Sequence, residues 1–214
     1  MDEEISIINS KTKEEKIKNF FVNNKNKIIS IIVILVLLLF GFFFYKEYKE
    51  DYRESLANKF NIAKSQYSSG DKSKVIQSME ELIDSKDSTY SPLALYFLID
   101  NKIVISKNKI NEHFDQVLNE VKLDKEIKNL IIYKKALFNS EDINENDLLK
   151  ILNPLIKSDS VWKSHSLYLL AEYYFHNNQK QKAKEFYEQI INLKDSNKNI
   201  NSEVKKRLQS EYSE

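Results

Sequence analysis

The sequence predicts an all-α protein in which one transmembrane helix is followed by an array of antiparallel helix pairs. Its 214 residues include 2 Gly and 2 Pro, too few for β-sandwiches, barrels or Gly-rich nucleotide-binding folds, which need turn residues at short intervals. Hydrophobic residues make up 42% of the chain and charged residues 30%, a balance typical of folding chains rather than disordered ones. One long uncharged stretch is followed by helical runs with short polar connections.

Net charge and cysteine content exclude several classes of protein. The formal net charge is +1, whereas a dedicated nucleic-acid binder carries a clear basic excess. The chain has no cysteine, which excludes disulfides, thiolate metal sites, a cysteine nucleophile and a lipid anchor attached through cysteine. We therefore expect no nucleic-acid partner.

The uncharged stretch runs from Ile28 to Tyr45 and is bounded by Lys27 and Lys46. As a helix it would span about 27 Å at ~1.5 Å per residue, close to the ~30 Å hydrocarbon core of a bilayer. A buried core helix is the first alternative, but every face is apolar and so small a domain could not surround it. A cleaved signal peptide is the second, but the small residues of a cleavage site are missing. We predict an uncleaved signal anchor that contacts membrane lipid through residues 28–45.

The orientation follows from the lengths of the two sides. The 15 residues before the span carry five lysines, and the 15 after it carry four Lys or Arg, a weak bias toward a cytoplasmic N-terminus. Long domains translocate largely regardless of charge. We therefore expect residues 1–27 to be a cytoplasmic segment and the longer part to lie outside the cytoplasm. Phe20-Phe21-Val22 fits a short amphipathic helix at the bilayer surface, with a frayed tail as the equal alternative.

Past the span, the helix is expected to continue as a stalk, because no Gly or Pro lies between Gly41 and Gly70. Apolar and aromatic residues there step by three or four and form one stripe. The stripe consists of Tyr45, Tyr48, Tyr52, Leu56, Phe60, Ala63 and Tyr67. Gly70 is the expected C-terminal stop of this helix.

Seven further helical runs are expected after Gly70. Their approximate ranges are 72–85, 92–105, 109–121, 124–139, 145–157, 161–177 and 180–194. Ser91-Pro92 is interpreted as an N-cap with Pro at the first helical position, Pro154 as a kink or restart, and Asn177-Asn178 as a stop. Residues 195–201 are expected to be a polar linker and 202–211 a loose terminal helix.

Residues 164–195 carry a pattern in which small and aromatic residues recur on two consecutive helices, as in the tetratricopeptide repeat. Its positions are held by Leu167, Leu170, Ala171 and Tyr174 on the first helix and by Ala183, Tyr187 and Ile190 on the second. Antiparallel helices approach closely only where side chains are small, so Ala171 and Ala183 are expected to face each other at the crossing. Fainter copies earlier in the chain extend the prediction to a stacked, tetratricopeptide-like array.

With this pattern, the chain resembles the bacterial ancillary SecYEG translocon subunit and cell division coordinator family. The stretch from Leu148 to Ile190 is similar to the family's last repeat and a half. The resemblance implies a single-pass inner-membrane protein with a periplasmic domain that associates with translocon subunits or periplasmic chaperones. Residues 46–199 are accordingly expected to form the stalk and the periplasmic tetratricopeptide-like domain, and residues 200–214 a C-terminal tail.

No catalytic, cofactor or metal site is predicted. His113, His165 and His176 have no second histidine three or four residues away, as a helical metal clamp needs, and are interpreted as ordinary surface or helix-end residues. The motifs of phosphate loops, GxSxG hydrolases and HExxH proteases are missing. We expect neither an enzyme nor a small-molecule substrate.

The leading hypothesis for function is a membrane-tethered protein-interaction scaffold. Two alternatives stay open: a structural or regulatory component of envelope growth or cell division, and a cryptic enzyme. Repeat arrays bind partners on an extended concave surface. We expect some of five tyrosines to line that surface: Tyr90, Tyr96, Tyr133, Tyr168 and Tyr173.

Overall fold

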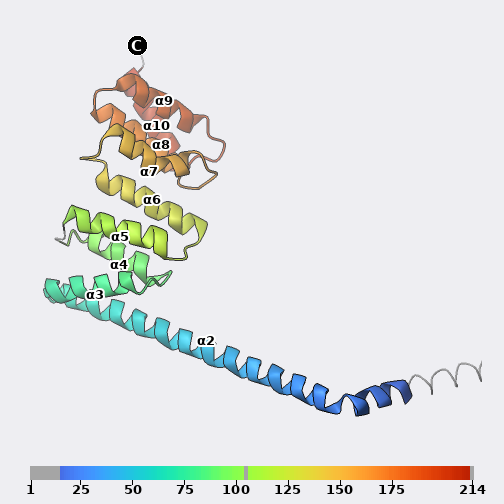
Figure 1. Ribbon diagram of the computed structural model, residues 1–214. Coiled ribbons are helices and arrows are strands. Elements are labelled where there is room, and N and C mark those ends of the chain that lie inside the picture. Colours follow the sequence, from blue (N-terminus) through green and yellow to red (C-terminus); the bar gives the residue numbers. More distant parts are fainter. Residues whose placement is uncertain (1–14, 104–105, 213–214) are drawn as a thin grey trace, which may run out of the picture. The chain divides into compact units, whose positions relative to one another are not determined.

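A computed structural model describes residues 15–103 and 106–212, and these residues form helices and turns with no strand. The predicted all-α fold is confirmed. The chain divides into two compact units, Met1–Ser55 and Leu56–Glu214. The helices are α2 (Lys25–Ser68), α3 (Lys72–Asp84), α4 (Tyr90–Asp100), α5 (Lys107–Glu120), α6 (Lys125–Asn139), α7 (Glu145–Ile156), α8 (Lys163–His176), α9 (Lys180–Ile191) and α10 (Lys198–Tyr212) (Figure 1).

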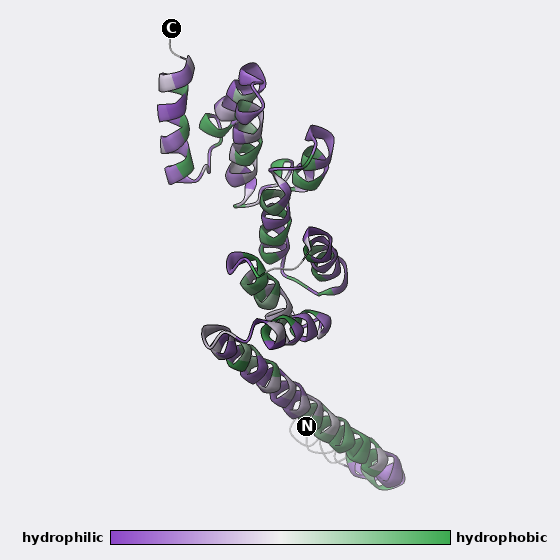
Figure 2. Ribbon diagram, turned by 90° about the vertical axis from the view of Figure 1, so that its left-hand side faces the viewer, coloured by the Kyte–Doolittle hydropathy of each residue, from purple (hydrophilic) through white to green (hydrophobic). Residues whose placement is uncertain are grey.

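The first unit contains the apolar part of α2, which is long and apolar enough to cross a membrane. Every side chain from Ile29 to Tyr45 is exposed, and Ile28 is half-buried. Figure 2 colours the ribbon of this part of α2 mostly green, the colour of hydrophobic residues. None of the apolar window is buried within the described part of the chain, whereas the core helix of a soluble protein is mostly buried.

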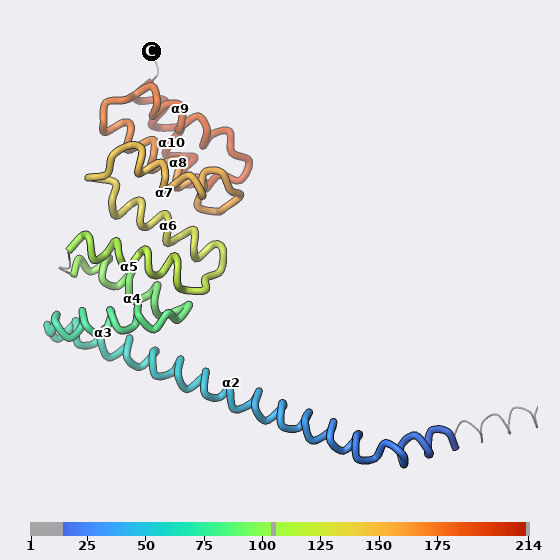
Figure 3. Tube along the Cα trace, in the orientation of Figure 1, coloured from blue at the N-terminus to red at the C-terminus, as the bar shows by residue number. Residues whose placement is uncertain are grey.

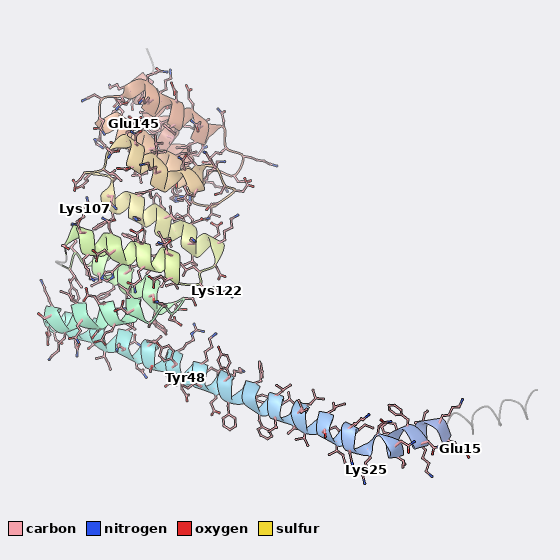
Figure 4. The ribbon with its side chains drawn as sticks, viewed as in Figure 1. Glu15, Lys25, Tyr48, Lys107, Lys122 and Glu145 are labelled. Carbon is pink, nitrogen blue, oxygen red and sulfur yellow. The ribbon has the colours of Figure 1, made fainter. Side chains whose placement is uncertain are left out.

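The stripe predicted on the stalk splits into an exposed part and a buried part. Tyr45 and Tyr48 are exposed, and Figure 4 labels Tyr48 on α2. In the second unit, Leu56 and Ala63 are buried, and Phe60 packs against the same core. The stripe is therefore covered only where other helices reach it.

Gly70 ends α2 as predicted. Its φ is +90°, a left-handed conformation that costs glycine little. The N–H of Gly70 donates to the Tyr67 carbonyl at 3.1 Å, and the N–H of Asp71 donates to the Gln66 carbonyl at 3.3 Å. These two bonds form a Schellman motif, which satisfies the last carbonyls of α2.

Two lysines and an asparagine adopt the same left-handed conformation at other helix ends. Lys86, Lys102 and Asn178 have φ of 54°, 47° and 57°. At the predicted stop, the N–H of Asn178 donates to Phe175 and the N–H of Gln179 to the Tyr174 carbonyl. The chain thus makes sharp helix ends without glycine, at a cost of roughly 1–2 kcal/mol for each left-handed L-residue.

This cost predicts that Lys86→Gly makes the protein more stable than Lys86→Ala does, by about 1 kcal/mol. Both variants lose the exposed ion pair between Lys86 and Glu120 (2.7 Å), so the difference between them isolates the backbone. Urea unfolding of residues 46–214 followed by circular dichroism measures it. Equal midpoints for the two variants would contradict a left-handed Lys86.

The second unit is a stack of consecutive helices with a core in two parts (Figure 3). The first part joins the end of α2 to α3, α4 and α5 and extends to Ile131 of α6. The second begins at Ala136 of α6 and extends to Val204 of α10. Helix α6 therefore contributes to both parts and links them.

Helix α4 begins earlier than predicted, so the interpretation of Ser91-Pro92 as a cap is wrong. Thr89 is the N-cap, and Asp87 Oδ1 accepts the N–H groups of Thr89 and Tyr90 at 2.8 and 2.9 Å. Ser91 lies inside the helix, where its hydroxyl donates to the Leu82 carbonyl at 2.9 Å. Pro92 is tolerated because an N–H in the first turn has no partner within the helix. The last residues of the predicted range, 104–105, lie outside the described residues.

Two elements nearer the C-terminus also differ from the sequence prediction. Helix α7 runs through Pro154 without a restart and ends two residues later, at Ile156. The proline is tolerated there because, in the last turn, it removes a single helical hydrogen bond. The terminal helix begins at Lys198, four residues before the predicted start. It packs against α9 and α8 and buries Val204, so it covers the end of the core.

Candidate functional site

The seven residues of the repeat pattern lie together in the second part of the core. Each is at most 2% exposed. Leu167, Leu170, Ala171 and Tyr174 come from α8, and Ala183, Tyr187 and Ile190 come from α9. Both alanines are fully buried, and the two helices pack against each other along their length. These residues hold the array together and are not available to a partner.

Tyr174 couples the last helix pair to the preceding one. Its hydroxyl donates to Glu145 Oε1 at 3.0 Å, and its ring stacks on Phe186 with 5.4 Å between centroids. Lys182 binds the same carboxylate at 2.9 Å. Burial, with Glu145 as acceptor, raises the pKa of Tyr174 to about 12. The hydrogen bond from Lys182, followed by that from Tyr174, lowers the pKa of Glu145.

A polar network joins α8, α9 and α10 within the second part of the core. The Tyr187 hydroxyl donates to Glu172 Oε1, and Arg207 donates to Glu172 Oε2 at 3.1 Å. Burial is the main cause that raises the pKa of Tyr187. The sequence pattern predicts Tyr187 as a packing residue, but nothing in the pattern indicates its partners Glu172 and Arg207.

Replacing Ala171 with leucine is expected to destabilise the fold by about 1–3 kcal/mol through overpacking. The site is fully buried, so the extra methyl groups must displace α9. A lower melting temperature of residues 46–214 by circular dichroism would support this. Glu185→Leu, at an exposed position of α9, is the control and should change stability by no more than about 0.5 kcal/mol. An unchanged melt for the alanine variant would show that the two helices do not cross closely there.

Alternate helices of the array present apolar side chains that the described residues do not cover. On α6, Ile127 and Leu137 are 41% and 48% exposed, and on α4 Leu93 is 40% exposed. Ile127, Leu130 and Leu137 follow a three- and seven-residue spacing and so share one side of α6. We call the exposed side of α4, α6 and α8 the interaction face, and it comprises Leu93, Tyr96, Ile127, Leu130, Leu137, Leu169 and Tyr173.

Two hollows lie on the interaction face. One, of about 350 Å³, lies between α4 and α6 and is lined by Leu93, Tyr96 and Ile127, with Lys122 at its edge. Figure 4 labels Lys122 at the connection between α5 and α6. The other, of about 500 Å³, lies between the end of α6 and α8 and includes Tyr173. Both are open and mostly apolar, which suits a protein surface better than a small polar substrate.

Aromatic and cationic side chains pack against one another on α6, at the start of α8 and on α4. Tyr133 stacks on Trp162 with 5.6 Å between ring centroids, and His165 lies 5.0 Å from Trp162. Burial lowers the pKa of His165. On the α4 side, Lys134 lies 4.6 Å from the centre of the Tyr96 ring. Large amphipathic aromatics of this kind are enriched where proteins bind each other.

The five tyrosines proposed for a binding surface separate into two groups. Tyr96 and Tyr173 line the two hollows. Tyr133 lines neither hollow: it stacks on Trp162 and packs against the second part of the core. Tyr90 instead packs against Phe60, and Tyr168 packs against Tyr187, so both belong to the core.

The three histidines lie at separate places in the array, His113 on α5 and His165 and His176 near the two ends of α8. His176 lies in the last turn of α8, as predicted. The surface interpretation of His113 is wrong, because it is 3% exposed and its Nε2 lies 3.4 Å from Glu80 Oε1 across the contact between α5 and α3. Within residues 15–103 and 106–212, no cluster of three or more His, Asp or Glu could hold a metal ion.

Comparison with known proteins adds one finding to this geometry. A family model described as a tetratricopeptide repeat-like domain matches residues 18–209. No curated protein and no solved structure matches the chain. The matched range includes the apolar helix and the helical array up to residue 209, within α10.

Proposed function

Since the chain belongs to the tetratricopeptide repeat-like domain family, we propose that it is a membrane-anchored scaffold for protein–protein interactions. The observation that carries this proposal is the interaction face. Leu93, Ile127 and Leu137 are each at least 40% exposed, although the helices that bear them pack tightly on their other sides. Contiguous apolar surface on a folded domain marks a binding site more often than chance, and repeat arrays bind partners along such extended surfaces.

Residues 28–45 are the proposed membrane anchor. The exposed, uncharged surface of α2 supports this assignment. We propose that the N-terminal segment is cytoplasmic and that the helical array lies in the periplasm, because long domains are translocated and short leaders are retained. Protease added to spheroplasts should then remove the array, and a C-terminus that stays protected until lysis would contradict this orientation.

Proteins that leave the secretion translocon, translocon subunits and periplasmic chaperones are the partners we propose. The resemblance noted in the sequence supports this class, and the interaction face suits it, since unfolded or partly folded proteins expose apolar segments. A tether at the membrane raises the local concentration of the face, so weak contacts can suffice. No reaction is part of this proposal.

The proposal is tested with Ile127→Glu, which places a charge in the hollow between α4 and α6. Crosslinking in native membranes followed by mass spectrometry should recover fewer translocon subunits and chaperones than with the wild type. The matched control is Ile62→Glu on α2, where the native side chain is 58% exposed and is not part of the interaction face. Equal recovery from the two variants would contradict the role of the face. Recovery of division or cell-wall proteins in place of translocon subunits would favour the alternative role in envelope growth.

A further inference from the structure

A short helix precedes the proposed anchor and is separated from it by a turn. Residues 15–23 are helical, Asn24 is a turn, and α2 begins at Lys25. The Asn24 side chain donates to the Phe20 carbonyl at 2.9 Å, and its own N–H donates to the same oxygen at 3.0 Å. Figure 4 labels Glu15 at the start of this helix and Lys25 at the start of α2, and Figure 1 shows the chain changing direction between the two helices. The short helix is therefore not a simple extension of the membrane span.

One side of the short helix is apolar and exposed. Ile17, Phe20 and Phe21 are 58%, 60% and 55% exposed. Their spacing places them within one sector, since successive residues turn by about 100°. The two rings meet edge to face, with 6.0 Å between their centroids. Val22 is 65% exposed, but lies about 140° from Ile17 and so belongs to the opposite side.

Lysines flank this apolar sector on both sides. Lys16 and Lys18 each lie about 100° from Ile17, one on either side. Lys25 and Lys27 follow at the start of α2, and Glu15 is the one acidic residue of the segment. Four positive charges less one negative charge leave residues 15–27 with a net charge of +3. An apolar sector bordered by lysines is typical of helices that lie at a membrane surface.

The distance from the anchor places this helix at the depth of the lipid headgroups. Asn24 lies four residues before Ile28, about 6 Å along a helix. The headgroup region on each side of the hydrocarbon core is roughly 5–8 Å thick. A helix that ends this close to the hydrocarbon boundary can lie flat in the headgroup region with its apolar sector against the acyl chains.

We propose that residues 15–23 form an interfacial helix that binds the surface of an anionic phospholipid leaflet. Ile17, Phe20 and Phe21 face the acyl chains, and the lysines contact lipid phosphates. The inference rests on the proposed anchor, which holds the helix at the membrane. Charge complementarity selects the occupant, because anionic lipids attract lysines next to a span, whereas an apolar protein groove would not need them.

Single spin labels test the depth of each side of the helix. The chain has no cysteine, so Ile17→Cys, Asn19→Cys, Phe21→Cys and Val22→Cys each carry one label on an otherwise native full chain. The variants are reconstituted in vesicles of phosphatidylcholine and phosphatidylglycerol. Labels at 17 and 21 should collide mainly with oxygen, which is concentrated in lipid, and labels at 19 and 22 mainly with a water-soluble nickel chelate. Equal collision rates at all four positions, or labels at 17 and 21 shielded from both reagents by a protein contact, would overturn the proposal.

The charge requirement is tested by a variant that replaces Lys16, Lys18, Lys25 and Lys27 with glutamine. In the same vesicles, labels on this variant should collide with oxygen and with the nickel chelate equally on both sides of the helix. The same loss of difference is expected for the singly labelled chains with all four lysines in vesicles of phosphatidylcholine alone. If the difference persists in both cases, anionic lipid is not the partner. A label at Leu37→Cys reports on the anchor separately. A water-accessible label there would refute the membrane span itself, whereas a deep label with no alternation at 17–22 would refute only the interfacial helix.

Discussion

Replacing Tyr187 with alanine is expected to lower the free energy of unfolding of residues 46–214 by about 3–5 kcal/mol. Tyr187 has the largest fully buried side chain among the described residues. Its ring contacts both Tyr168 and Tyr212. Its removal would leave a cavity between α8, α9 and α10 and free the Glu172 carboxylate from one donor. Urea unfolding followed by circular dichroism gives the difference.

Two further variants separate packing from hydrogen bonding in this prediction. Tyr187→Phe keeps the ring and removes the donor to Glu172, at an expected cost of about 1–2 kcal/mol. Arg207 remains bound to the same carboxylate, which limits the loss. Tyr48→Ala, at a position 71% exposed, is the control for loss of a tyrosine ring and should cost no more than about 0.5 kcal/mol. If the alanine variant at 187 is no worse than the phenylalanine variant, the ring does not pack as described.

Removing residues 28–45, with export supplied by a cleavable leader, is expected to reduce partner recovery by roughly 10²–10⁴-fold. The untethered array keeps its interaction face but loses its confinement to the membrane, where the translocon subunits among its proposed partners reside. Quantitative co-purification of translocon subunits and chaperones from cells measures the change.

The control for this deletion is a chain in which an unrelated apolar span replaces residues 28–45. Such a span restores the tether without the native sequence, so recovery should return. Undiminished recovery from the untethered array would show that affinity alone sustains the complex. Failure of the unrelated span to restore recovery would mean that the native span itself contacts a partner.

Local patterns in the sequence were sufficient to predict the larger elements of the fold. The uncharged run from Ile28 to Tyr45 and the lack of breakers before Gly70 predict the long helix α2. The repeat spacing predicts that the chain is a tetratricopeptide-like array, which the family match confirms. Such features depend on residues close together in the chain, so the periodicity of the sequence is enough to predict them.

Helix ends were harder to predict where glycine is missing. Lys86 and Lys102 adopt left-handed conformations, which lysine rarely adopts, so its presence in the sequence does not predict them. The start of α4 depends on Asp87, which accepts two backbone N–H groups. Ser91 does not cap the helix, because its hydroxyl donates to the Leu82 carbonyl of the preceding helix instead.

The sequence by itself determined that this protein is all-α, that one helix can span a membrane, and that Ala171 and Tyr187 belong to a repeat pattern. Only the tertiary structure decided which side chains are buried and which form the interaction face. It placed His113 against Glu80 from a helix 33 positions away in the chain, joined Glu172 to Arg207 across 35 positions, and left Ile127 and Leu137 uncovered. The physical reason is that periodicity shows which residues share one side of a helix, whereas burial depends on which other helix packs against that side.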